Sequence, residues 1–334
     1  MRIALDAMGG DSAPQVEVEG AIQSIPLISG HEVVLVGDEA QIKAAAAKLG
    51  GFPPGITIRH ASQAIRMEDH PVDALRHKPD SSIIRCVEMA KNGEVDAVVS
   101  AGNTGGVVAV AMLKWGMLEG VRRPGIAVSI PTRTGGHVLV IDCGANVKCT
   151  PEHLLQYGVM ASAYTKWVFR KAKPNVGLLN IGAERTKGNA LVQGASDLFE
   201  KAQFHYIGFV EGREVFHDVA DVVVCEGFVG NVLLKVSEGM VETIIGMIKH
   251  SLRRTLRRRI GAMLCKYAMI DVAAKIDPSE LAGAPLLGVD GNCVICHGGS
   301  NSRAIAVAIR RAVGAATHHV NQHIVADLQL NGTT

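Results

Sequence analysis

Short runs of Val, Ile, Leu and Ala alternate with longer segments of helical periodicity along almost the whole chain. The candidate strands are residues 2–5, 32–36, 57–60, 97–100, 126–130, 138–141, 176–180, 222–224 and 293–296. The helical patterns are residues 13–28, 39–49, 106–115, 151–170, 189–202, 231–259 and 302–321. Strands that alternate with helices predict βαβ units and a doubly wound α/β fold, with a mostly parallel sheet covered on both faces.

The composition agrees with such a fold. Apolar residues make up 48% of the chain but aromatic residues only 4%, so small and branched aliphatic side chains must fill the core, as in strands buried on both faces. No repeat or linker divides the pattern, and we expect a single domain over residues 1–330 that includes a helical region at 231–270. No apolar run reaches the roughly 18 residues of a membrane span.

Charge and cysteine usage exclude several classes of protein. The net charge of +2 is too small to indicate nucleic-acid binding. The seven cysteines are an odd number and no apolar signal segment precedes the first strand, so we expect a reducing cytoplasm. Cys293 and Cys296 have the spacing of a metal site but no second pair, and we expect them in the core on opposite sheet faces. We therefore predict no metal and no cofactor.

Six of the expected strands end in turns rich in Gly, Asn and Asp. These turns are residues 6–11, 100–106, 142–146, 180–188, 226–231 and 296–301. Free amides at a helix N-terminus suit an anion, and glycine allows the backbone to approach it closely. The turns match neither the dinucleotide fingerprint nor the P-loop. We therefore expect phosphate at one edge of the sheet, in an enzyme of another class.

A few side chains in these turns could do chemistry. Lys187 could neutralise phosphate or stabilise an oxyanion, or it could be a solvated lysine before a helix. His297 could move a proton or bind phosphate, or it could be a packed or surface histidine. The amides of the turns could bind ligand or only hold their turns through local hydrogen bonds. They are Asn103, Asn146 and Asn231.

The most basic part of the chain is also amphipathic. Residues 243–270 contain seven basic and no acidic side chains. One helical stripe collects Val241, Ile244, Ile245, Ile248, Leu252 and Leu256. Arg259 projects back onto this stripe, so we expect the helix to bend or end before Gly261. Such a helix suits an anionic membrane surface or an acidic protein, and a subunit interface with a solvated basic face explains it equally well.

Six motifs, in this order and over nearly the whole chain, resemble the bacterial phosphate acyltransferase (PlsX) family. They are residues 1–11 (MRIALDAMGGD), 100–105 (SAGNTG), 144–147 (GANV), 221–235 (DVVVCEGFVGNVLLK), 283–289 (GAPLLGV) and 297–298 (HG). The resemblance implies transfer of a fatty acyl group from acyl carrier protein to inorganic phosphate, giving acyl phosphate for phospholipid synthesis. It also implies a fold related to phosphotransacetylases and isocitrate dehydrogenase-like enzymes.

The resemblance further implies partners and a location. These are a homodimer, peripheral attachment to the inner face of the cytoplasmic membrane, and a downstream membrane glycerol-3-phosphate acyltransferase. The residues expected to contact the membrane or the carrier protein are Lys249, Leu252, Arg253, Leu256 and Arg257.

We assign site roles on the matching motifs. The predicted catalytic residues are Lys187, Asn231 and His297. The residues expected to bind phosphate or substrate are Asp6, Gly9, Gly10, Asp11, Asn103, Thr104, Gly105, Gly144, Asn146, Gly230, Gly298 and Ser300. The chain departs from the family pattern at Lys148, Ala183, Arg185, Glu226 and Gly299. The first three departures are expected to raise the positive charge near the site.

Two other functions remain open from the sequence. A phosphotransacetylase would use an acyl-CoA thioester in place of the carrier protein. A non-catalytic membrane scaffold would need only the basic helix. Activity with each thioester separates the two enzymes, and vesicle binding without thioester cleavage would indicate the scaffold.

Overall fold

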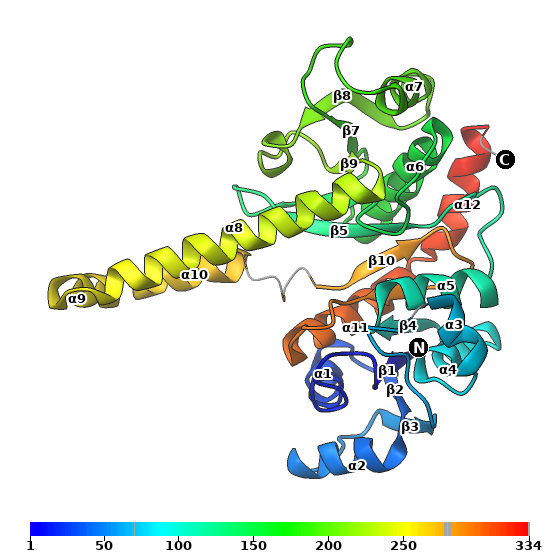
Figure 1. Ribbon diagram of the computed structural model, residues 1–334, viewed down its shortest axis with the longest axis vertical. Coiled ribbons are helices and arrows are strands. Elements are labelled where there is room, and N and C mark those ends of the chain that lie inside the picture. Colours follow the sequence, from blue (N-terminus) through cyan, green and yellow to red (C-terminus); the bar gives the residue numbers. More distant parts are fainter. Residues whose placement is uncertain (70, 277–278, 280–281, 333–334) are drawn as a thin grey trace.

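The computed structural model describes residues 1–69, 71–276, 279 and 282–332. One eleven-stranded sheet forms its centre, in the order β3-β2-β1-β4-β11-β10-β5-β6-β9-β7-β8 (Figure 1). The strands are β1 (Arg2–Asp6), β2 (Glu32–Gly37), β3 (Ile56–His60), β4 (Ala97–Ser100), β5 (Gly125–Pro131), β6 (His137–Ile141), β7 (Asn175–Asn180), β8 (His205–Glu211), β9 (Val222–Val224), β10 (Ala284–Leu287) and β11 (Cys293–Ile295).

Helices cover both faces of this sheet, as the alternating pattern predicts. They are α1 (Gln15–Ser24), α2 (Glu39–Lys48), α3 (Pro71–His77), α4 (Ser82–Lys91), α5 (Thr104–Lys114), α6 (Pro151–Val168), α7 (Ala190–Phe199), α8 (Gly227–Arg253), α9 (Leu256–Leu264), α10 (Lys266–Ile276), α11 (Ser302–Thr317) and α12 (Val320–Leu330). Short 3₁₀ turns lie at Ile25–Leu27 and Glu214–Phe216. The doubly wound, mostly parallel α/β fold is confirmed.

The sheet consists of two parallel blocks that run in opposite senses. The first block is β3-β2-β1-β4-β11 and the second is β6-β9-β7-β8, with parallel pairing inside each. Between them, β10 and β5 make three successive antiparallel pairings. Three reversals turn the second block against the first, so the expectation that all six turns lie at one edge of a parallel sheet is wrong.

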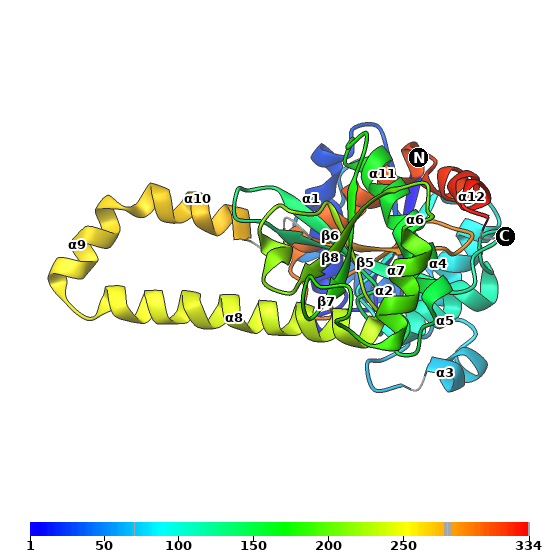
Figure 2. The same ribbon diagram turned by 90° about the horizontal axis from the view of Figure 1, so that it is seen from above.

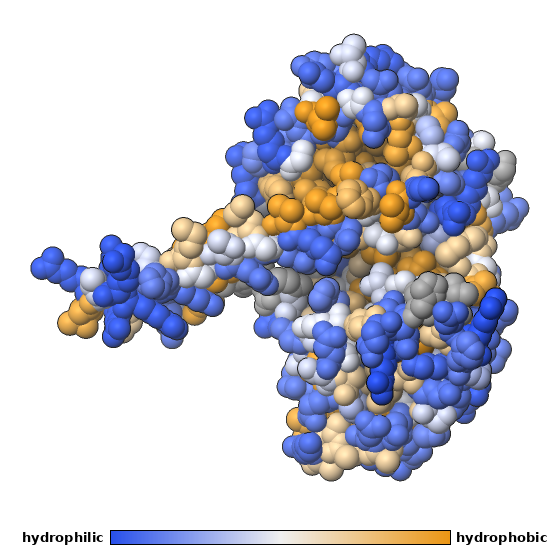
Figure 3. Space-filling view, in the orientation of Figure 1, coloured by the Kyte–Doolittle hydropathy of each residue, from blue (hydrophilic) through white to orange (hydrophobic). Residues whose placement is uncertain are grey.

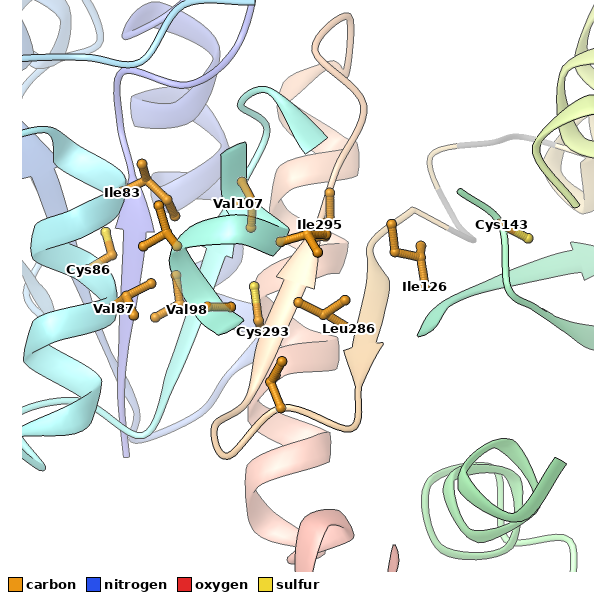
Figure 4. Close-up of a cluster of buried hydrophobic side chains, with 14 of the residues drawn as sticks. Ile83, Cys86, Val87, Val98, Val107, Ile126, Cys143, Leu286, Cys293 and Ile295 are labelled. Atoms are coloured by element: carbon orange, nitrogen blue, oxygen red, sulfur yellow. The ribbon is translucent and has the colours of Figure 1, made fainter. Parts of the chain in front are cut away.

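The core follows the two-residue period of the strands. Ile3 and Leu5 face the helices α1, α2 and α11, whereas Ala4 faces α4 and α5. The cluster that contains Ala4 continues across the centre of the sheet, where side chains of β4, β11, β10 and β5 lie in a row (Figure 4). Cys293 and Cys296 are buried in clusters on opposite faces, as expected from their spacing. The small aliphatic side chains thus bury both faces of the strands.

Two predicted helices differ from those observed. The pattern over residues 302–321 is two helices, because α11 ends at Thr317 and His319 adopts a left-handed φ of 48° before α12. The pattern over residues 231–259 begins earlier, at Gly227, and is interrupted after Arg253. Thr255 caps the next helix there, since its side chain accepts a hydrogen bond from the amide of Arg258. The expected break before Gly261 is therefore observed, between Arg253 and Leu256.

The helices α8, α9 and α10 form an arm that projects from the body (Figures 1 and 2). Much of its apolar surface lies open, with Ile244 47% and Leu256 74% exposed. Lys249 and Arg253 are on the last turns of α8, and Arg257 is on the first turn of α9 at the far end of the arm. Within the described residues, no helix is both long and apolar enough to cross a membrane.

Candidate phosphate site

The turns after β1, β4 and β11 form one group. Asp6 ends β1 and is 2% exposed, and its carboxylate accepts hydrogen bonds from Ser100 Oγ at 2.7 Å and from the amide of Met8 at 3.2 Å. A Cβ on Gly9 would lie 2.7 Å from Asp6 Oδ2 and 2.7 Å from the amide nitrogen of Gly102. Only glycine allows so close an approach of the two turns. Asp6 therefore holds the turn after β1 in place from the buried side. A direct contact of Asp6 with phosphate, as expected from the sequence, does not fit this burial.

His297 and Asp11 lie at the surface of the same group. The amide of Asp11 donates to the carbonyl of Gly298 at 2.9 Å, which joins the turns after β1 and β11. Nδ1 of His297 accepts a hydrogen bond from the amide of Gly299 at 3.1 Å. Because Nδ1 is an acceptor, a neutral His297 carries its proton on Nε2. His297 is exposed and can thus present an N–H donor to an anion.

The turn after β4 leads into α5. Asn103 caps this helix, since its Oδ1 accepts from the amide of Gly106 at 3.0 Å, and its Nδ2 donates to the carbonyl of Met67 at 2.8 Å. Of the two open interpretations of Asn103, local turn support is observed. Thr104 and Gly105 follow in the first turn of α5 and are exposed. Their free amides are the part of this turn that can meet a ligand.

The turns after β6 and β9 form a second group around Asp142. Oδ1 of Asp142 accepts hydrogen bonds from the amides of Ile126, Gly144 and Ala145 at 2.9–3.1 Å. Oδ2 accepts from the amide of Asn146 at 2.8 Å. Burial raises the pKa of Asp142, and its bonds to backbone amides act in the opposite direction. This carboxyl organises the predicted binding residues Gly144 and Asn146, although the sequence did not single it out.

The start of α8 fits tightly against that turn. A Cβ on Gly230 would lie 1.9 Å from the carbonyl oxygen of Asp142, so any larger residue would push α8 away. Asn231 Cβ would lie 3.8 Å from a Cβ on Gly144, which places the predicted catalytic amide beside the turn after β6. Glu226 caps α8 by accepting from two backbone amides, at 2.7 and 3.1 Å. The carboxylate of Glu226 therefore already accepts hydrogen bonds from two backbone amides at the N-terminus of α8.

Lys187 lies in the turn between β7 and α7. Its side chain is exposed, and its backbone carbonyl accepts from Asn180 Nδ2 at 3.2 Å. Arg185 in the same turn reaches back to α7 and forms an ion pair with Glu200 at 2.8 Å. The expected rise in positive charge from Arg185 is therefore largely cancelled, because its guanidinium is paired.

The structure thus separates the predicted site residues into two groups. The first group contains Asp6, Gly9, Gly10, Asp11, Asn103, Thr104, Gly105, His297, Gly298 and Ser300. The second group contains Gly144, Asn146, Lys187, Gly230 and Asn231. The contacts described above join the turns after β1, β4 and β11, and those after β6 and β9, whereas Lys187 is placed in the second group by the pairing of β7 with β9. The arm residues Lys249, Leu252, Arg253, Leu256 and Arg257 extend away from both (Figure 1).

Glu17 is a buried acid beneath the first group that the sequence analysis did not identify. It lies in the first turn of α1, is 1% exposed, and its Oε2 has no hydrogen-bond partner among the described residues. A Cβ on Gly10 would lie 2.2 Å from Oε1. Burial raises the pKa of Glu17 to about 7, and the nearby charges of Asp6 and Asp11 act in the same direction. Glu17 is therefore largely protonated below neutral pH.

Replacing Glu17 by Gln is expected to stabilise the fold mainly at high pH. The pKa of Glu17 is about 7 in the fold against 4.5 as its ordinary value, so the native state loses stability as pH rises from 4.5 through 7. Glutamine resembles the protonated acid and avoids this loss, which amounts to about 3 kcal/mol for a shift of this size. Urea unfolding at pH 5 and pH 8 should show a gain for Glu17→Gln that is several times larger at pH 8. A gain of equal size at both pH values, or a similar gain in the half-buried control Glu19→Gln, would contradict the assignment.

Five of the cysteines lie in the interior of the described part of the chain. Cys86, Cys143, Cys225, Cys293 and Cys296 are buried. Burial raises the pKa of Cys293 and Cys296 to about 12, so neither is a thiolate at neutral pH. The described residues contain no group of three His, Cys, Asp or Glu side chains placed to hold a metal ion.

Solved structures define the class of fold. A phosphotransacetylase from Streptococcus pyogenes superposes with a TM-score of 0.62 and 15% sequence identity, covering 95% of this chain and 94% of that one. A phosphotransacetylase from Staphylococcus aureus gives a TM-score of 0.59 and 16% identity, with the same coverage. The chain therefore has the α/β fold of the phosphotransacetylases.

Sequence comparison then gives the family. A protein from Geotalea daltonii named phosphate acyltransferase is 46% identical over 331 residues, which cover 99% of this chain and 95% of that protein. A phosphate acyltransferase from Desulfitobacterium hafniense is 46% identical over 313 residues, covering 93% of each. The family model described as "Fatty acid synthesis protein" matches residues 1–323. The chain belongs to this family.

Proposed function

We propose that the protein transfers a fatty acyl group from the thioester of acyl carrier protein to inorganic phosphate, as a single domain over residues 1–330. The match of 99% of the chain to a relative named phosphate acyltransferase carries this proposal. The glycine turns support it, because free backbone amides near Thr104 and Gly105 suit an anion. The product is an acyl phosphate, for use in phospholipid synthesis.

The reaction needs no acyl-enzyme. A phosphate oxygen attacks the thioester carbonyl, the new C–O bond forms, and the C–S bond breaks with its electron pair leaving on sulfur. Lys187 and the turn amides position phosphate and stabilise the oxyanion. Nε2–H of His297 donates to phosphate or protonates the departing thiolate, and Asn231 holds the ligand beside the turn after β6, so the mechanism requires phosphate to lie between the two groups of turns. A thiolate is a fair leaving group, so these roles require no strong general acid.

The arm supports the proposed partners. Its open apolar stripe suits a second copy of the chain in a homodimer, and its basic residues suit an acidic carrier protein and an anionic membrane surface. We therefore propose peripheral attachment to the inner face of the cytoplasmic membrane, next to a membrane glycerol-3-phosphate acyltransferase that consumes the product. Lys249, Arg253 and Arg257 provide the charge, and Leu252 and Leu256 the apolar contact.

The proposal predicts thiol release from palmitoyl-acyl carrier protein that depends on inorganic phosphate. Purified protein should release free thiol only when phosphate is present, and hydroxylamine should trap the acyl phosphate. Release without phosphate would identify a thioesterase and remove the role of phosphate as nucleophile. Cleavage of acyl-CoA but not of the carrier-protein thioester would identify the phosphotransacetylase reaction.

A further inference from the structure

Large apolar side chains are exposed in three of the turns that contain the predicted site. Val147 follows the turn after β6, Ile181 follows β7, and Phe228 follows the turn after β9. They are 68%, 82% and 60% exposed. Single exposed apolar residues are common on protein surfaces, but a contiguous group marks a binding surface. Val147, Ile181 and Phe228 therefore indicate a binding surface only if they lie side by side.

The sheet brings the three turns together. β9 pairs with β6 on one side and with β7 on the other, so Val224 lies between Ile141 and Leu178. Neighbouring strands are about 4.8 Å apart, and all three run in the same direction. The amide of Gly227 donates to the carbonyl of Asn146 at 2.9 Å, which joins the two chain segments that carry Phe228 and Val147. The turns that carry the three exposed side chains thus lie at one rim of the second block.

The apolar surface continues along α8. Val232, Val236 and Met240 are 44%, 61% and 56% exposed and follow Phe228 at intervals of four residues, which places neighbours along one side of the helix. Twelve residues from Phe228 to Met240 span about 18 Å at 1.5 Å per residue. Apolar side chains gather over the root of α8 and the adjoining strands (Figure 3). The surface therefore begins at the polar turns and leads away from them.

We propose that Val147, Ile181 and Phe228 form an acyl platform that holds the hydrocarbon chain of the thioester, with its distal part lying along the root of α8 from Phe228 to Met240 and short of the stripe at 241–256 that is proposed for the second copy. The inference rests on the proposed function. The substrate of the proposed reaction has a thioester carbonyl that must reach phosphate, and its apolar acyl chain begins at that carbonyl and must extend away from the phosphate site. Polar turns with an adjoining apolar surface match both ends of that molecule. The platform would thereby favour long acyl chains over short ones.

Alkyl phosphates of increasing length test the platform without catalysis. Full burial of one methylene raises affinity about fourfold. On this open surface we expect affinity to rise at least about twofold for each added methylene. The six methylenes that separate butyl from decyl phosphate should then raise affinity about 60-fold. Ile181→Ser and Phe228→Ser should reduce this gain to under about 10-fold by titration calorimetry. Both side chains are mostly exposed, so the variants should fold. Leu113→Ser is the matched control, since Leu113 is 70% exposed on α5 and should leave the gain unchanged.

The kinetic counterpart uses thioesters of one carrier with acyl chains from butyryl to palmitoyl. The loss of kcat/KM in Ile181→Ser and Phe228→Ser should grow with chain length. Equal loss at all lengths, or a variant that changes the oligomeric state while keeping the affinity gain, would overturn the platform and assign these residues to structure or to a subunit contact. A wild-type protein that binds alkyl phosphates with the expected gain but cleaves no thioester would support the platform and refute the proposed function instead.

Discussion

Replacing Lys187 by Ala is expected to slow phosphate-dependent thiol release by about 10²–10³-fold, the usual cost of losing one donor to a developing oxyanion. Lys187 is exposed in the turn between β7 and α7, and its neighbour Arg185 is paired with Glu200. Lys187 is thus the basic side chain of this turn that can meet an anion. Steady-state kinetics at varied phosphate concentration measures the effect.

The way the loss divides between the kinetic constants distinguishes two roles of Lys187. A rise in the KM for phosphate with little change in kcat would mean that the ammonium binds phosphate equally well in the ground state and the transition state. A fall in kcat would mean that it stabilises the oxyanion. Lys187→Arg should recover part of the activity, and Lys201→Ala, an exposed lysine just beyond α7, should have none of these effects. Activity of Lys187→Ala within a few-fold of wild type would refute the assignment.

Much of this architecture could be predicted because its signals are local. The buried strands appear as aliphatic runs, and helix starts carry residues that bond their own backbone, as Asn103 does at α5. Thr255 gives the same signal and would have located the break in the basic helix had it been considered as a cap. Local chemistry therefore identified the turns. It also indicated that the side-chain amides of these turns can hold the backbone in place, as Asn103 does.

The remaining features depend on contacts between distant segments. The reversal of the second block results from the antiparallel pairing of β5 with β6, because β10 pairs antiparallel with both β11 and β5 and leaves those two strands in the same sense. Nothing in one strand's sequence fixes the direction of its neighbours. Glu17 similarly appears in sequence as an ordinary charged residue of a helix, and only the approach of Gly10 reveals that it is buried. Periodicity and motif spacing therefore could not predict at which edge of the sheet each turn lies.

The second large effect concerns stability. Asp142→Ala is expected to lower the free energy of unfolding by about 4 kcal/mol, because the substitution removes the acceptor of one buried and three part-buried backbone amides and an unsatisfied buried donor costs about 1–3 kcal/mol. The carboxylate accepts from Ile126, Gly144, Ala145 and Asn146 at 2.8–3.1 Å and is fully buried. The total free energy of unfolding of a natural domain is only about 5–15 kcal/mol. Urea unfolding should therefore detect a large shift of the midpoint.

Asp142→Asn provides the matched control. An asparagine oxygen at the Oδ1 position keeps the bonds from Ile126, Gly144 and Ala145, whereas its NH₂ group replaces an acceptor beside the amide of Asn146. The loss in free energy should therefore be roughly half that of Asp142→Ala, on the order of 2 kcal/mol. Equal losses in both variants would show that the negative charge, rather than the count of hydrogen bonds, stabilises the turn. A loss below about 1 kcal/mol in Asp142→Ala would mean that water replaces the carboxylate, and Asp142 would then not be the residue that holds Gly144 and Asn146 in place.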